Sequence, residues 1–134
     1  MVDAQLVLEQ QRPMLTEFLA DIGLSSGGEL PHLVSLLPAF DKWLAELTVE
    51  PDDVAYLASR LGAYICLYLI NYHGAKPAIV DNRIILAVPG EHGTWREFEP
   101  LRLAFGLASK AATGTPIEFA TVLGALEPVR PNPA

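Results

Sequence analysis

A chain of 134 residues has the length of one domain, and its single cysteine excludes both an internal disulfide framework and a cysteine-based structural zinc site. The formal net charge is −7, and residues 1–67 carry the whole excess because they hold ten acidic and three basic residues. Such a field disfavours nucleic acid and anionic lipid as partners and favours a basic one, while the simpler explanation is that the charge keeps the protein soluble.

The first segment, residues 3–23, has apolar residues at helical spacing, and Pro13 either kinks this helix or begins a second one. A loop rich in glycine and serine follows at 23–28. The first ten residues contain neither a basic region nor an apolar signal core. We therefore expect a cytoplasmic protein.

Residues 31–47 are expected to form two short helices separated by Pro38, because a proline inside a helix removes a backbone hydrogen bond. The second of them, at 39–47, places apolar residues including Phe40 and Trp43 on one face. Residues 48–51 connect this helix to the next one.

The stretch 51–74 is apolar on most of its circumference, so it is predicted to be one central helix that the other elements cover. Asp52 or Asp53 is expected to cap its first amides, and Gly74 to end it in the left-handed conformation. Gly62, on its most apolar face, predicts the close approach of another helix or a sheet. The helix is long enough to span a membrane, but an internal arginine and the lack of flanking basic residues favour a soluble protein.

All four tyrosines of the chain lie on this helix. Their simplest role is structural, with buried rings and with hydroxyl groups that find backbone partners. The alternative is a ligand pocket between the tyrosine side of helix 52–73 and the segment that follows it. Its lining would be Tyr64, Tyr68, Tyr72 and Trp95.

After the central helix the sequence changes to short runs of β-branched and apolar residues. Residues 77–88 are predicted to form a β-hairpin, because Asp81 and Asn82 tolerate the positive φ angles that a two-residue turn requires. Residues 94–98 favour a third strand over the alternative of a helical segment. Together these predict a small antiparallel sheet.

Pro100 begins a further helix, and Thr113-Gly114 ends it. A capping box at 115–118 is expected to start the last helix, which runs to residue 126. Residues 1–126 thus form a single globular domain, and residues 127–134 form a proline-rich tail. The predicted fold class is α+β, mainly helical, with a long buried central helix and a small antiparallel sheet.

No clustered chemistry in the sequence predicts an active site. The three histidines lack the spacing of metal ligands, and His73 at the end of the central helix has a favourable position in the helix dipole. Glu91 and His92 on a loop are the strongest candidates for a metal site or an acid–base pair, but two adjacent residues make a weak site. We therefore predict no catalytic residues, no cofactor and no bound metal.

Between residues 44 and 107 the order of features resembles a loose group of small uncharacterised bacterial α+β domains. The features are Leu61-Gly62-Ala63-Tyr64 in a helix, Gly74, the hairpin 77–88, and Phe98-Glu99-Pro100 leading into another helix. Some similar domains accompany secreted toxins or secretion systems. The resemblance implies a fold of this kind and implies no catalytic residues.

These observations favour a non-catalytic protein-binding module of the bacterial cytoplasm, such as an immunity or adaptor protein. The expected partner surface consists of acidic side chains, namely Asp41, Glu46, Glu50, Asp52 and Asp53. One alternative is a small-ligand-binding protein or small enzyme that uses the tyrosine pocket. Another is a homodimer, since 51% of the residues are hydrophobic and this supply exceeds the needs of a small core.

Overall fold

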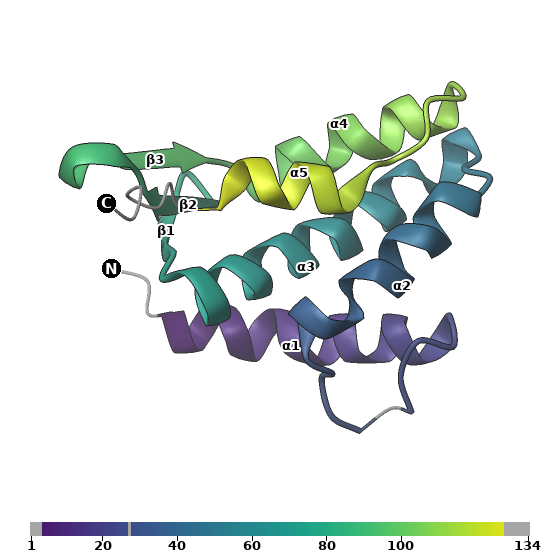
Figure 1. The fold of residues 1–134 in the computed structure, drawn as a ribbon, viewed down its shortest axis with the longest axis horizontal. Helices are drawn as coiled ribbons and strands as arrows, with labels where there is room; N and C mark the ends of the chain where they lie inside the picture. The colour runs from purple at the N-terminus through teal and green to yellow at the C-terminus, as the bar shows by residue number, and fades with distance from the viewer. Residues whose placement is uncertain (1–3, 27, 128–134) are drawn as a thin grey trace, which may run out of the picture.

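The structure is a computed structural model that describes residues 4–26 and 28–127. Its described part has five helices, of which one is central, and Figure 1 shows the three short strands at one side. In chain order the elements are α1 (Ala4–Asp21), α2 (Leu33–Glu46), the 3₁₀ turn η1 (Pro51–Asp53), α3 (Val54–His73), β1 (Lys76–Val80), β2 (Arg83–Pro89), the 3₁₀ turn η2 (Glu91–Gly93), β3 (Trp95–Phe98), α4 (Pro100–Ala112) and α5 (Phe119–Leu126). The predicted α+β fold class is confirmed.

Helix α3 is the body on which the other elements pack, and every residue at 61–69 is buried. Figure 1 shows α1 on one side of α3 and α4 and α5 on the other. The segment Pro51–His73 is long and apolar enough to cross a membrane, but 67% of its most apolar window is buried inside the protein. The prediction of a long buried central helix is confirmed.

Two glycines of α3 have the roles that the sequence predicts. A Cβ atom placed on Gly62 would lie 3.5 Å from the Cα atom of Leu101, so the backbone of α4 approaches α3 closely at this position. Gly74 has φ 69° and ends α3 in the left-handed conformation. Because a methyl group would just fit at Gly62, larger side chains would have to displace α4.

Neither proline divides its helix, which excludes a second helix beginning at Pro13 and shows that the predicted break at Pro38 is wrong. Pro13 lies inside a continuous α1, and Pro38 lies inside a continuous α2 instead of separating two helices. Each proline removes one backbone hydrogen bond, whereas α2 buries Leu33, Phe40 and Leu44 along one face. Tertiary packing of that face therefore outweighs the local cost.

The predicted side-chain caps are also wrong. Asp52 and Asp53 belong to the 3₁₀ turn η1, and neither η1 nor α3 receives a side-chain cap hydrogen bond. Helix α5 begins at Phe119, after the expected capping box at 115–118. Its cap comes from α2, where Oδ1 of Asp41 accepts hydrogen bonds from the backbone N–H groups of Phe119 at 2.6 Å and Ala120 at 3.1 Å.

The three strands form an antiparallel sheet in the order β1-β2-β3. The predicted hairpin turn is confirmed, since Asp81 and Asn82 have φ angles of 52° and 63°. The predicted third strand is confirmed as β3. Alternate residues of β2, Leu86 and Val88, are buried against the helices, which places the sheet beside the C-terminal end of α3.

Candidate functional site

An open cavity of 240 Å³ lies where the C-terminal ends of α1 and α2 meet the N-terminal end of α3. These helix ends lie on the side of the molecule opposite the sheet (Figure 1). The cavity has an aromatic wall of Phe18, Trp43 and Tyr56 and a rim that includes the carboxylates of Asp21 and Asp53. We call it the acidic groove.

The aromatic wall is held in place by ring contacts. The ring of Phe18 meets those of Trp43 and Tyr56 edge-on, at centroid distances of 5.7 and 6.1 Å. Behind Trp43 the ring of Phe40 is stacked in parallel at 6.1 Å. The guanidinium carbon of Arg60 lies 3.9 Å from the centroid of Tyr56. Such contacts fix the orientation of aromatic rings, so the wall is a formed surface.

Two carboxylates beside the groove occupy unfavourable positions in their helices. Asp21 is the last residue of α1 and Glu46 the last residue of α2, and neither helix has a basic residue in its last turn. The negative end of a helix dipole repels a carboxylate there, at a cost of about 0.3–1 kcal/mol each. Among the described residues the ion pairs are His73–Glu127 and Arg83–Glu99, so neither acid is neutralised by such a pair.

The five acids predicted to form a partner surface fall into two groups. Glu46, Glu50, Asp52 and Asp53 are exposed where α2 ends and α3 begins, and Asp53 lines the groove. Asp41 is half-buried, and its carboxylate caps α5. The structure thus brings four of the five together, while the binding role of all five stays a prediction.

The tyrosine side of α3 is packed. Tyr64 is 0% exposed, and its ring stacks on Phe40 at a centroid distance of 4.7 Å. Its hydroxyl donates a hydrogen bond to the carbonyl oxygen of Leu33 at 2.6 Å, and burial raises the pKa of this hydroxyl. The hydroxyl of Tyr72 accepts a hydrogen bond from the N–H of Leu33 at 3.3 Å. These rings and hydroxyls therefore fix the start of α2 against α3.

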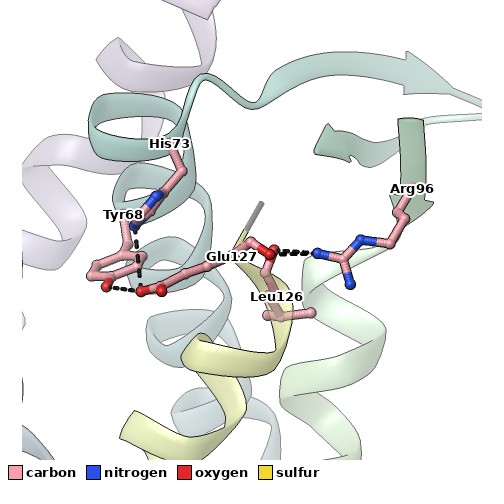
Figure 2. Close-up of polar contacts among 5 residues, drawn as sticks. All are labelled: Tyr68, His73, Arg96, Leu126 and Glu127. Atoms are coloured by element: carbon pink, nitrogen blue, oxygen red, sulfur yellow. Dashed lines mark hydrogen bonds and ion pairs between the residues drawn. The ribbon is translucent and has the colours of Figure 1, made fainter. Parts of the chain in front are cut away.

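Figure 2 shows a second polar cluster, at the C-terminal end of α3, which we call the C-terminal polar cluster. The hydroxyl of Tyr68 donates a hydrogen bond to Oε1 of Glu127 at 2.5 Å, and Nε2 of His73 lies 3.4 Å from the same oxygen. Burial, followed by the hydrogen bond and charge of Glu127, raises the pKa of Tyr68 to about 12. The guanidinium of Arg96 donates to the last carbonyls of α5, including that of Glu127 at 2.6 Å.

The other predicted candidates belong neither to the acidic groove nor to the C-terminal polar cluster. Trp95 is 45% exposed on β3, and the Nζ atom of Lys76 lies 4.8 Å from its ring centroid, so Trp95 and the buried Tyr64 are in different environments. Glu91 and His92 are exposed in η2. No group of three histidine, cysteine or acidic residues in the described part of the chain is placed to hold a metal ion.

Self-association is predicted from the high apolar content, and the exposed apolar side chains that could form such an interface lie on α4 and β1. Leu101 and Phe105, one turn apart on α4, are 51% and 48% exposed, and Ile79 and Val80 of β1 are also exposed. Sedimentation velocity at micromolar concentration is the measurement, and a 14.5 kDa species alone would contradict self-association. It stays a prediction.

Sequence reasoning missed the groove and the C-terminal polar cluster for different reasons. Phe18, Trp43 and Tyr56 come from three separate segments, and each fits an ordinary apolar helix face. The available signal was the acidic residue at the end of each of the first two helices, where basic residues are usual. Glu127 was assigned to the tail, and its contact with Tyr68 spans 59 positions of the chain.

A search for similar proteins found no matching family model, no matching curated protein and no matching solved structure.

Proposed function

We propose that this chain is a non-catalytic protein-binding module that docks a basic partner on the acidic groove and on the carboxylates beside it. The observation that carries the proposal is the meeting of three helix ends, which places acidic side chains around a formed aromatic cavity. Aromatic anchors at the centre and charged groups at the rim are the usual composition of a protein interface.

The placement of Asp21 and Glu46 supports a basic partner. Each carboxylate ends a helix, where it lowers the stability of the free protein. Proteins break such local rules mainly at functional sites. A cationic surface that docks here neutralises both carboxylates and the adjoining exposed acids, so part of the binding free energy comes from relief of this repulsion.

The alternative of a small ligand beside the tyrosines has less support. Tyr64 is fully buried, and both it and Tyr72 are engaged with the backbone of Leu33. A ligand between α3 and the hairpin would have to displace these contacts. The resemblance to bacterial domains that accompany toxins or secretion systems agrees with an immunity or adaptor role, and we propose that role for the module.

The experiment compares two double charge reversals that change the net charge equally. The first is Glu46→Lys with Glu50→Lys beside the groove, and the control is Glu91→Lys with Glu97→Lys at the sheet end; all four side chains are exposed. A protein captured by the wild-type chain from a lysate of the source cells is purified, and its on-rate to each variant is measured at several salt concentrations.

We expect the on-rate to fall steeply with salt and to drop severalfold in the first variant only, because exposed charges steer association. The melting temperature should not fall in either variant, since exposed charges contribute little to folding and Glu46 has an unfavourable position at the end of α2. An on-rate that is indifferent to salt and to reversal would show that the negative charge serves solubility and would overturn the proposal.

A further inference from the structure

We propose that the acidic groove holds the guanidinium group of one arginine side chain of the partner, stacked on Trp43 and paired with Asp21 and Asp53. This inference rests on the proposed function and specifies which side chain fills the cavity. The volume supports a single side chain, because 240 Å³ is less than the roughly 300–1,000 Å³ of pockets that enclose a whole small molecule.

Trp43 is the available platform in the aromatic wall. Tryptophan gives the strongest cation–π contact of the aromatic residues, and this one is partly exposed in the cavity. Phe40 lies parallel behind it and Phe18 meets it edge-on, so its ring is fixed before a ligand arrives. Preorganisation of this kind lowers the entropy cost of binding.

The guanidinium group of Arg60 already contacts one ring of this wall, although Arg60 does not itself line the cavity. Its guanidinium carbon lies over the ring of Tyr56 at 3.9 Å from the centroid, so that ring already has a cationic neighbour. No cationic side chain among the described residues lies over the ring of Trp43. The side chain of Arg60 donates a hydrogen bond to Oγ of Ser59 at 2.7 Å, and it forms no ion pair with Asp21 or Asp53. Within the described part of the chain, the rim carboxylates therefore remain available to a second cation.

Arginine fits the groove better than lysine for two physical reasons. A guanidinium group is planar and weakly hydrated, so it can leave water and stack on an indole ring at a lower cost than an ammonium group. It also presents several N–H donors in one plane, which can pair with more than one carboxylate at the same time. Asp21, the last residue of α1, and Asp53, in η1, both line the cavity.

The test uses Trp43 as its own reporter. The chain contains two tryptophans, so Trp95→Phe leaves Trp43 as the only indole fluorophore. The full chain with this substitution is titrated with three blocked tripeptides, Gly-Arg-Gly, Gly-Lys-Gly and Gly-citrulline-Gly, at matched ionic strength. Citrulline has the shape of arginine without its charge, so it separates electrostatic recognition from simple burial.

We expect a saturable change of Trp43 fluorescence with the arginine peptide, with a Kd on the order of millimolar. The citrulline peptide should bind at least about tenfold more weakly, and the lysine peptide severalfold more weakly. Asp53→Asn should weaken arginine binding by about tenfold, as expected for the loss of a charged hydrogen bond. The adjacent Asp52→Asn is the matched control, because Asp52 is exposed but does not line the cavity, and it should leave binding unchanged.

Equal responses to the arginine and citrulline peptides, equal responses to arginine and lysine, or no saturable response would each overturn the arginine assignment. An equal loss in Asp52→Asn and Asp53→Asn would overturn the pairing with Asp53. These results are distinct from failure of the proposed function, because the salt dependence of the partner's on-rate would be unaffected by them. Thermal melting of each variant confirms that it is folded.

Discussion

The two ends of α3 differ in whether the charged side chains near them have partners within the chain. At its C-terminal end the carboxylate of Glu127 accepts a hydrogen bond from Tyr68, and Arg96 donates to the carbonyls that end α5. At its N-terminal end Asp21 and Asp53 border an open cavity, and neither forms an ion pair with any residue in the described ranges. The charged groups at the C-terminal end thus have partners within the chain, whereas Asp21 and Asp53 at the other end form no ion pair among the described residues.

This difference separates stability from binding along one helix. Substitutions in the C-terminal polar cluster or at the middle of α3 should destabilise the fold, because the groups there have partners within the chain. Substitutions around the groove should leave stability unchanged or improve it, because the acids there lack such partners.

The largest effect on the stability of the fold is expected at alkaline pH, where the buried hydroxyl and thiol groups of α3 lose their protons. Burial raises the pKa of Cys66 from 9.0 to about 12, and it raises the pKa of Tyr68 from 10.0 to about 12. Over this range the folded state keeps protons that the unfolded chain has lost, so stability is complete below about pH 9 and falls as the pH rises. For the fully buried thiol of Cys66 the loss can reach about 1.4 kcal/mol per pH unit.

Urea unfolding at about pH 8 and about pH 11 measures this dependence. Tyr68→Phe should flatten the profile, because phenylalanine has no proton to lose. A wild-type stability that is equal at both pH values would contradict the prediction.

The next largest effect on stability is expected midway along α3, where α4 packs closely against Gly62. Gly62→Leu should lower the free energy of unfolding by about 1–3 kcal/mol, because the larger side chain would collide with α4. Gly62→Ala is the control: its Cβ would lie 3.5 Å from Leu101, an ordinary contact, and alanine favours a helix by about 1 kcal/mol. A Gly62→Leu variant that unfolds at the wild-type urea concentration would rule out the close approach.

The carboxylate of Asp41, which has partners inside the chain, should stabilise the fold. Asp41→Ala removes the cap of α5 and should cost about 0.5–2 kcal/mol in urea unfolding. Asp41→Asn keeps an acceptor oxygen, so its free energy of unfolding should fall by less. If both variants match the wild-type chain, the contact does not contribute to stability.

At the C-terminal polar cluster, Arg96→Ala should cost about 1 kcal/mol, because it leaves the last carbonyls of α5 to water. Arg83→Ala is the matched control. Its ion pair with Glu99, at 3.3 Å, is at the surface, with the Arg83 side chain 52% exposed, and should contribute less. Equal melting temperatures for the two variants would show that the cluster is no stronger than a surface pair.

The smallest expected effect on stability is a gain instead of a loss. Glu46→Lys replaces a repelled charge with a favourable one at the end of α2, so it should raise stability by about 0.3–1 kcal/mol. The same substitution should weaken binding of a basic partner. A loss of stability in this variant would indicate that the carboxylate has a partner within the chain.

Features set by local chemistry were predictable from the sequence. The turn at Asp81 and Asn82, the end of α3 at Gly74 and the close approach at Gly62 each follow from the conformation or size of a few adjacent residues. The long buried helix was predictable as well, because its apolar surface has to be covered.

Features set by contacts between distant segments were not predictable. The cap of α5 comes from Asp41, which is 78 positions away from Phe119, and the continuity of α2 through Pro38 depends on how its apolar face packs. The acidic half was recognised, but the aromatic wall was not, because no local pattern brings Phe18 beside Trp43. Such sites require the tertiary structure.

The sheet also has a consequence for how the protein behaves in concentrated solution. In the described sheet β1 pairs only with β2, so the outer backbone edge of β1 is left without a neighbouring strand, and Ile79 and Val80 beside it are exposed. An unpaired edge of this kind is a template for strand addition and aggregation. Lys76 and Pro77 protect only its beginning, by charge and by the missing N–H group. Shelf life and expression yield should therefore depend on three residues of the hairpin, 78–80, that contribute little to the core.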